Sequence, residues 1–279
     1  MPASRSIKPG TRRGGGAAAV VEPRRPIWPL ALLGALAALA ILLIALPASL
    51  IGRMAPANVT LQDFSGSLWH GSAGRITVNG RDAGALEWRL HPAPLLGLTL
   101  AADLHWVKAA FVADGRVRLD RHALSLEHVT GGGPIDSLQS LGIAPGWHGS
   151  ATLDVARLQA DLDGGEPRWR AAAGELRVTD LHSPAFAGGA TLGGYALRVA
   201  DGAIGADGNG SARLVDTGGP LALDAVIQFS VKERRGIASG TIAARSEADP
   251  ALRAEIDKLA QLRPRDPQGR VPFDLELSL

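Results

Sequence analysis

The feature that most constrains this chain is a period of two in its hydrophobic residues after position 59. Alternation of apolar and polar residues is typical of a strand with one buried and one exposed face. The longest example covers residues 221–231, where every second residue is apolar. Shorter examples occur at 86–90, 98–106 and 271–279. We therefore predict an antiparallel β structure of about a dozen short strands.

Glycine supplies the expected turns, with 35 glycines among 279 residues against a norm of about 7 %. Asn79-Gly80 predicts a hairpin with a type I′ turn. Further turns are predicted at Asp114-Gly115, Asp201-Gly202 and Asp207-Gly208. Gly131 to Pro134 is predicted to interrupt the strands and to separate two parts of the sheet.

Three local patterns depart from simple alternation. The apolar spacing in residues 135–141 predicts a short helix or a lid-like turn. Asp249-Pro250 predicts an N-cap followed by proline at the first helical position, and residues 252–259 carry an apolar helix face. A change of parity predicts a β-bulge near Ala156-Arg157. A sandwich or barrel and an open, curved sheet with an apolar inner face both fit these patterns.

A second constraint is the apolar run from Trp28 to Leu50, with no charged residue between Arg25 and Arg53. A run of about 20 apolar residues is long enough to cross a bilayer as a helix. The hydrophobic region of a cleaved signal peptide is shorter, about 7–15 residues. We therefore predict an uncleaved, single-span anchor at residues 27–52.

The charge distribution sets the expected topology. Residues 1–53 hold seven Lys or Arg and one acid, a net charge of +6. The whole chain is +2, so residues 54–279 carry +2 − 6 = −4. The positive-inside rule then predicts a disordered basic tail, residues 1–26, in the cytoplasm, and a domain of residues 53–279 across the membrane. The high isoelectric point of the chain, about 9.4, therefore reflects the basic tail and the membrane topology, and no nucleic-acid partner is expected.

The predicted fold class is mainly β: an N-terminal single transmembrane helix followed by an extended, curved antiparallel β-sheet domain with one short late helix. One motif occurs twice, as Trp69-His-Gly-Ser-Ala73 and as Trp147-His-Gly-Ser-Ala151. Trp88 and Trp169 follow the two copies, which suggests two related halves at about 59–130 and 145–279. We interpret Trp69, Trp88, Trp147 and Trp169 as core anchors that fix strand register, with an interface role open to one or two of them.

Catalytic and metal-binding chemistry has little support in the sequence. The chain has no cysteine, which excludes disulfides, thiol catalysis and zinc sites of the cysteine type. Its seven histidines follow no metal-ligand spacing, and no known catalytic motif is present. His70 and His148 are the sharpest candidates for a paired pH-sensitive or metal site. A structural interpretation explains these two histidines better: strand alternation would turn both imidazole rings outward, beside a tryptophan that packs inward. We predict no enzyme activity, no cofactor and no metal.

At this point the sequence resembles the N protein of the bacterial type II (general) secretion pathway, over about Leu46 to Leu279. The order of several Gly- and Leu-containing motifs after the tail and anchor carries the resemblance. These motifs are Gly66-Ser-Leu-Trp69-His-Gly71-Ser-Ala73, Gly84-x-Leu-x-Trp88-x-Leu-x-Pro92-x-x-Leu95-Leu96, Gly174-x-Leu-x-Val178, Leu192-Gly-Gly-Tyr195, Gly219-Pro-Leu221, Ala248-Asp-Pro-x-Leu252 and Gly269-Arg-Val-Pro-Phe273.

The resemblance implies a single-pass component of the cell inner membrane in a Gram-negative type II secretion machine. It implies a non-catalytic scaffold that supports export of folded periplasmic proteins across the outer membrane. The implied partners are other inner-membrane assembly-platform subunits, with the outer-membrane secretin as a further candidate. A different class of function remains as the alternative: an anchored periplasmic lipid-binding protein whose apolar sheet face forms a β-groove.

Overall fold

The computed structural model describes residues 45–55, 57–162, 168–205, 207–230, 233 and 235–278. The chain divides into two units, 1–43 and 44–279, and the second holds every described residue. The predicted tail and most of the predicted anchor fall on residues 1–44, outside the described residues. Within the described ranges, no helix combines the length and the apolar character needed to cross a membrane.

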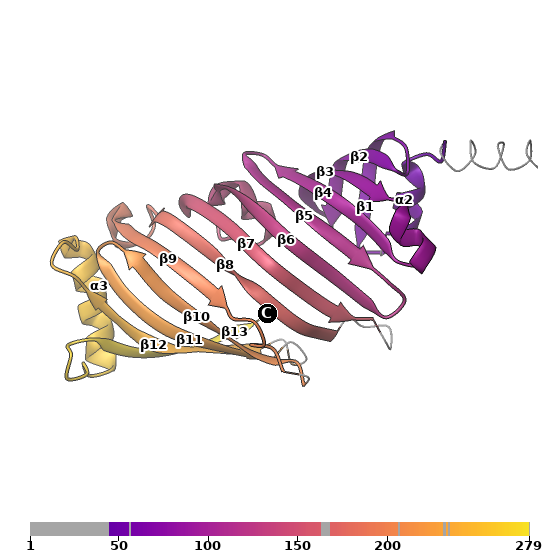
Figure 1. Cartoon of the computed structure of the whole chain (residues 1–279). Helices are drawn as coiled ribbons and strands as arrows, with labels where there is room; N and C mark the ends of the chain where they lie inside the picture. The colour runs from indigo at the N-terminus through magenta and orange to yellow at the C-terminus, as the bar shows by residue number, and fades with distance from the viewer. Residues whose placement is uncertain are drawn as a thin grey trace, which may run out of the picture. The chain divides into compact units, whose positions relative to one another are not determined.

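The described part of the chain forms one open, antiparallel sheet of 13 strands, in which consecutive strands are neighbours throughout (Figure 1). The strands are β1 (Val59–Gly66), β2 (His70–Val78), β3 (Arg81–His91), β4 (Leu100–Lys108), β5 (Phe111–Leu119), β6 (Ala123–Pro134), β7 (His148–Asp161), β8 (Arg168–His182), β9 (Thr191–Val199), β10 (Asn209–Gly218), β11 (Leu221–Ser230), β12 (Arg235–Ala244) and β13 (Val271–Ser278). The helical elements are α2 (Ser49–Met54), α3 (Pro250–Leu262) and the 3₁₀ turns η1 (Ala93–Gly97), η2 (Ile135–Leu141) and η3 (Ala187–Gly189). Of the predicted alternatives, the open sheet is the observed one.

Several local predictions are confirmed. Asn79 and Gly80 have φ of 50° and 77° and join β2 to β3 in the expected hairpin. The register of β7 against β8 shifts between Val155 and Arg157, where the bulge was predicted. The predicted short helix at 135–141 is the 3₁₀ turn η2, and the predicted late helix is α3.

Two predicted turns are wrong. Asp114-Gly115 lies inside β5, and Gly131 to Pro134 lies inside β6, which continues to Pro134. The chain turns earlier, between β4 and β5, where Ala109 takes a φ of 52°.

The glycines at these positions serve close packing between strands. β6 bulges at His128, which has a φ of 52°, and this brings Val129 against Gly115. A Cβ at Gly115 would lie 2.8 Å from Cγ2 of Val129, and one at Gly131 would lie 2.7 Å from Cβ of Ala113. Glycine in a strand often marks such an approach, so it is an ambiguous turn signal.

The two faces of the sheet differ in chemistry. Ala73, Leu86, Trp106 and Ala113 are successive register partners across β2 to β5, and they define the inner face. On the outer face the corresponding row contains Glu87, His105 and Asp114, and it continues through mostly charged residues, Thr130, Asp154, Glu175, Arg198 and Arg213, to Val226 of β11. An antiparallel sheet with one apolar and one charged face needs cover on one side only.

Three helical elements cover parts of the inner face. α2 and the residue before it pack against β2 to β4, in a cluster around Ala73, Trp88 and Leu90. η2 packs over the middle strands, in a cluster with Phe111, Ala113, Ile135 and Ala151. α3 packs at the other end, where the cluster contains Leu192, Leu221, Leu252, Ile256 and Val271.

The folded unit begins inside the range predicted for the anchor. Ala48 is only 2 % exposed, and its amide donates to the carbonyl of Gly66 at 3.4 Å. The amide of Leu68 donates to the carbonyl of Leu46 at 2.7 Å. These contacts tie residues 46–48 to the end of β1.

Candidate functional site

Helix α3 creates the most distinctive concave feature of the inner face. Asp249 caps the helix, since its side chain accepts a hydrogen bond from the Ala251 amide at 2.8 Å. Leu252 and Ile256 on the first turns are buried at 0 % and 2 % exposure. Leu259 continues the same helix face but is 44 % exposed. The helix therefore packs tightly at its start and leaves a space beneath its end.

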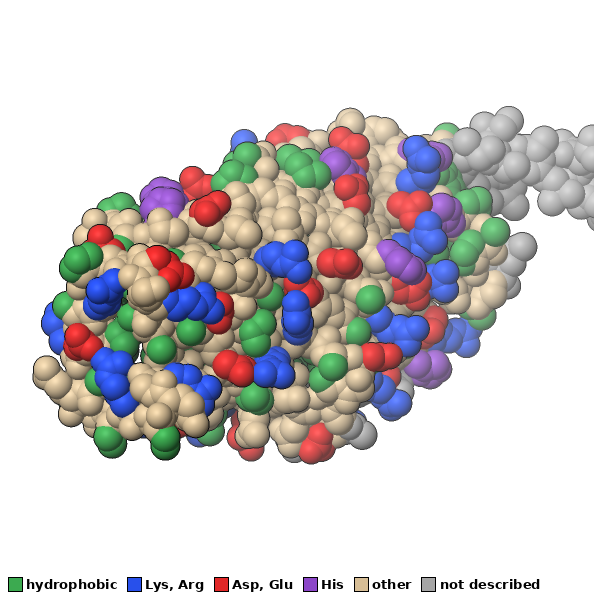
Figure 2. Space-filling view, turned by 60° about the vertical axis from the view of Figure 1, so that its left-hand side comes forward, with side chains coloured by type: hydrophobic (Ala, Val, Ile, Leu, Met, Phe, Trp, Pro, Cys, Tyr) green, Lys and Arg blue, Asp and Glu red, His purple; other side chains and the backbone are tan. Residues whose placement is uncertain are grey.

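This space is a recess of about 570 Å³ between α3 and strands β8 to β12. Its floor consists of apolar side chains, Leu192, Leu214, Leu221, Leu223 and Ile242. Trp147 and Phe186 form part of its wall, and the lining is almost entirely apolar. Figure 2 shows hydrophobic side chains at this end of the sheet, interspersed with Lys and Arg side chains. Among the described residues that line the recess, the charged ones are Glu255 and Lys258 of α3, which pair at 2.7 Å.

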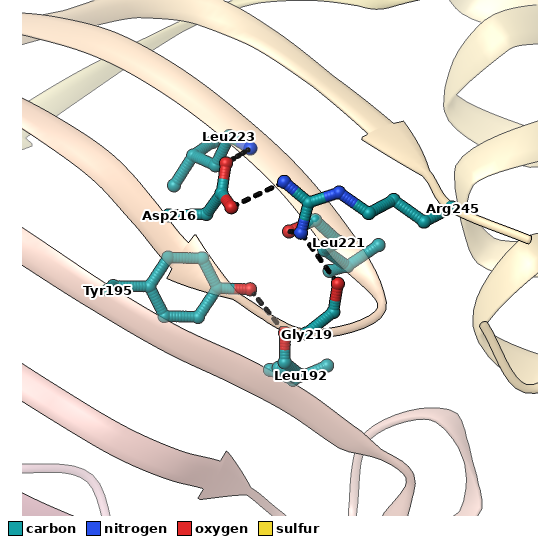
Figure 3. Close-up of polar contacts among 7 residues, drawn as sticks. All are labelled: Leu192, Tyr195, Asp216, Gly219, Leu221, Leu223 and Arg245. Atoms are coloured by element: carbon teal, nitrogen blue, oxygen red, sulfur yellow. Dashed lines mark hydrogen bonds and ion pairs between the residues drawn. The ribbon is translucent and has the colours of Figure 1, made fainter. Parts of the chain in front are cut away.

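A polar network lies at the edge of this apolar surface (Figure 3). Oδ1 of Asp216 on β10 lies 2.5 Å from Nη2 of Arg245, which follows β12. Nη1 of Arg245 donates to the Gly219 carbonyl at 2.7 Å, and the Leu223 amide donates to the second Asp216 oxygen at 3.0 Å. The network joins the β10–β11 hairpin to the segment that leads into α3.

Tyr195 completes this group from the neighbouring strand β9. It is the register partner of Asp216, and its hydroxyl donates to the Leu192 carbonyl at 2.7 Å. Burial, together with the negative charge of Asp216, raises the pKa of Tyr195 to about 12. Burial alone would raise the pKa of Asp216, but hydrogen bonds from Arg245 and from the Leu223 amide lower it overall. Both groups thus keep the protonation state that their partners require.

The two edges of the sheet are protected to different degrees. On β1, Asp63 takes a left-handed φ of 57°, and residues 46–48 cover the end of the strand. On β13 the register with β12 runs without a shift from Val271 to Ser278. Pro272 and the Arg263–Asp274 ion pair, at 2.6 Å, lie at the start of β13, and Leu275 beyond them is 56 % exposed. The second half of β13 is therefore the more accessible edge.

The predicted tryptophan anchors differ in burial and in the clusters that they contact. Trp88 is 5 % exposed, and its Nε1 donates to the Leu68 carbonyl at 3.0 Å. Trp69 is half-buried against the same cluster. Trp147 is half-buried, contacts the clusters of both η2 and α3, and lines the recess. Trp169 is half-buried opposite Ala160.

The last four residues of each copy of the repeated motif begin a strand, β2 at His70 and β7 at His148. Their following tryptophans are not equivalent, since Trp88 pairs with Gly71 inside the motif and Trp169 pairs with Ala160 outside it. His70 and His148 are separated by the intervening strands β3 to β6, so they do not form a pair. His148 instead stacks on His182 with ring centroids 5.4 Å apart. Within the described ranges, no group of three His, Asp or Glu side chains is arranged to hold a metal.

Asp216 and Arg245 carry no local sequence signal that would mark them as a pair. They are 29 residues apart, and only the register of β10 to β12 brings them together. Tyr195 ends the motif Leu192-Gly-Gly-Tyr195, which by itself indicates no role for the hydroxyl group.

A comparison with known protein families shows which family this chain belongs to. The family description "Type II secretion system (T2SS), protein N" matches residues 57–274, more than three quarters of the chain. The chain belongs to the type II secretion protein N family. No curated protein and no solved structure gives a significant match.

The family match confirms the resemblance seen in the sequence. It covers every strand up to the first residues of β13, and it includes α3 with the recess beneath it. Two motifs of that resemblance, Leu192-Gly-Gly-Tyr195 and Gly219-Pro-Leu221, supply carbonyl acceptors to the polar network of this protein N family member.

Proposed function

We propose that this type II secretion component is a non-catalytic scaffold, held at the inner membrane by the part of the predicted anchor, residues 27–52, that precedes residues 46–48, with its sheet in the periplasm. The regular outer edge of β13 carries this proposal. An uncovered strand edge presents free backbone donors and acceptors, and a partner strand can add to it. Charged side chains of the outer face pair with one another, as in Arg213–Asp224 at 2.9 Å, which fits a structural role for that face.

The proposed partners are the other inner-membrane subunits of the assembly platform, with the outer-membrane secretin as a second candidate. A single anchor confines the sheet and its partners to one membrane surface. Confinement raises their effective concentration, so weak strand contacts are enough for assembly. A cleaved, soluble version of the domain should therefore fold but complement a deletion poorly at native expression.

Photo-crosslinking in living cells tests the edge contact. A photoreactive residue placed at Glu276 of the full chain, in the accessible half of β13, should capture a platform subunit. The same residue placed at Val226, on the outer face of β11, is the matched control and should capture much less. A gene deletion should leave exoproteins in the periplasm, and the full chain should restore their release. No capture at 276, combined with normal secretion by the deletion strain, would refute the scaffold proposal.

The topology has its own test. Alkaline phosphatase fused after residue 279 should be active only if the sheet reaches the periplasm. An inactive fusion that is stably produced would place the sheet on the cytoplasmic side and remove the secretin from the list of partners.

The alternative, a lipid-carrying β-groove, calls for a continuous apolar trough along the sheet. α2, η2 and α3 each bury part of the inner face, so the apolar surface is divided into separate stretches. This division favours the scaffold as the main function.

A further inference from the structure

The recess beneath α3 lacks the features of a site for a polar ligand. Its lining is apolar, and the polar groups nearest to it are already paired. Tyr195 donates its hydroxyl proton to the Leu192 carbonyl, and Asp216 accepts from Arg245. Among the described residues, no buried side-chain nitrogen or oxygen lacks a hydrogen-bond partner. A ligand of this recess therefore gains affinity mainly by covering apolar surface.

Apolar side chains around the recess stay exposed. Leu259 is 44 % exposed, Leu262 is 81 % exposed and Phe186 on the opposite wall is 37 % exposed. All three line the same recess. A contiguous exposed apolar patch of this kind marks a binding surface more often than an isolated leucine does.

The size of the recess distinguishes between a partner helix and a single hydrocarbon chain. A helix with its side chains is about 10–12 Å wide and rises 5.4 Å per turn, so 570 Å³ holds roughly one turn. Recognition of a helix in a groove uses anchors spread over at least two turns. The volume lies within the range of about 300–1,000 Å³ that is typical of small-molecule sites. A single flexible chain therefore fits the recess better than a helix does.

Two charged side chains of opposite sign line the recess, Lys258 and Glu255, and the lysine is the more exposed of the two, at 67 % against 38 %. The two side chains pair with each other. An exposed ion pair is weak, so the ammonium group can also bind an anion at the mouth. A carboxylate or phosphate head group beside an inserted chain would occupy this position.

We propose that the recess beneath α3 binds one long acyl chain of an anionic lipid, with the head group beside Lys258. Either a free fatty acid or a phospholipid supplies this chemistry. The site goes beyond the scaffold role, because it does not involve the β13 edge.

Photo-labelling tests the site in the full chain in its native membranes. A palmitate analogue with a terminal diazirine should label peptides of α3 and of β9 to β12. Leu223→Trp fills the floor of the recess and should lower this labelling at least about fivefold, relative to label elsewhere on the same chain. Val226→Trp adds the same side chain to the same strand on the outer face, and labelling should be unchanged.

Two further measurements identify the ligand. Unlabelled saturated fatty acids should compete with the palmitate analogue, and longer acids should compete more strongly. The gain should be roughly tenfold for each added pair of methylenes, until the recess is full. Lys258→Glu should weaken competition by palmitate more than competition by neutral monopalmitoylglycerol. Stronger competition by a lysophospholipid than by palmitate would assign the chain to a phospholipid source, and the reverse would assign it to free fatty acid.

Several outcomes would overturn the proposal. Equal labelling of the recess in Leu223→Trp and in the unsubstituted chain would mean that the analogue does not enter it. If competition by fatty acids rises with acyl length equally in Leu223→Trp and in the unsubstituted protein, it reflects partition into the bilayer. A photoreactive residue at Leu259 that captures a polypeptide, while palmitate fails to reduce the capture, would assign the recess to a protein partner. The crosslink from a photoreactive residue at position 276 serves as a separate control in Leu223→Trp. A normal crosslink there would show that the scaffold contact is independent of this site, so failure of one proposal can be told from failure of the other.

Discussion

Asp216 and Arg245 bind each other across the end of the sheet, with Oδ1 and Nη2 2.5 Å apart. Arg245 also reaches the carbonyl of Gly219, at the turn between β10 and β11. The pair thus fastens this hairpin to the segment that carries α3. The Asp216 side chain is 16 % exposed and that of Arg245 is 35 % exposed, so the pair is partly shielded from water.

Asp216→Asn should lower the free energy of unfolding by about 1–2 kcal/mol. Removing one partner of a fully buried pair costs about 3–5 kcal/mol, and the partial exposure of Arg245 reduces that cost. Urea unfolding followed by tryptophan fluorescence measures the change. The control is Asp224→Asn on β11, because the Arg213–Asp224 pair is exposed and should contribute little. Similar losses from both variants would show that partial burial does not strengthen the Asp216 pair.

The same pair predicts a dependence on pH. The folded protein lowers the pKa of Asp216 below its ordinary value of about 4. Its stabilising effect is therefore complete above about pH 4 and is lost as the pH falls through the lowered pKa. The difference between the unsubstituted chain and Asp216→Asn should be constant between neutral pH and pH 5, and it should shrink on further acidification. A difference that persists unchanged at pH 2 would contradict the assignment.

Tyr195 is the only tyrosine in the chain, so its ionisation can be followed directly by ultraviolet absorbance. Burial raises its pKa to about 12, whereas an unfolded tyrosine titrates near 10. Because the folded state binds this proton more tightly, stability is complete below about pH 10 and falls as the pH rises towards 12. Tyr195→Phe should abolish the signal. A folded-state midpoint near 10 would mean that the hydroxyl is not shielded.

Local sequence signals were sufficient for much of the fold. Asn79-Gly80 and Asp249-Pro250 each set a backbone geometry with residues that are adjacent in sequence, so hairpin and helix were both predictable. The predicted turn at Gly115 is wrong because glycine serves two purposes, a turn with positive φ or a close approach between strands. Only the register of β5 against β6 distinguishes them. That register depends on the bulge at His128, which no local pattern indicated.

The candidate site was less predictable than the fold. Asp216 and Arg245 meet because β10, β11 and β12 pair in one particular register, and each residue alone resembles an ordinary surface charge. The recess depends on how far α3 lifts from the sheet after Ile256. The apolar spacing of Leu252, Ile256 and Leu259 predicts one continuous buried face, whereas Leu259 is 44 % exposed and only its neighbour Ala260 still packs, partly buried, against the cluster.

Gly115→Ala separates the two interpretations of that glycine. Its new Cβ would lie 2.8 Å from Cγ2 and 3.3 Å from Cα of Val129, so we expect a loss of about 1–3 kcal/mol. Gly97→Ala is the control, because no heavy atom lies within 4 Å of its Cβ position. Urea midpoints of the two variants measure the difference. Equal midpoints would show that the strands separate without cost at Gly115.

Leu252 and Leu262 lie at opposite ends of α3 and should respond differently to truncation. Leu252 is fully buried, and Leu252→Ala should cost about 2–5 kcal/mol because it leaves a cavity between the helix and the sheet. Leu262 is 81 % exposed, so Leu262→Ala should change stability by no more than about 0.5 kcal/mol. Hydrogen exchange of the α3 amides should accelerate in the first variant only. Equal effects would mean that the end of the helix also packs on the sheet, which would close the recess and remove the proposed chain-binding site.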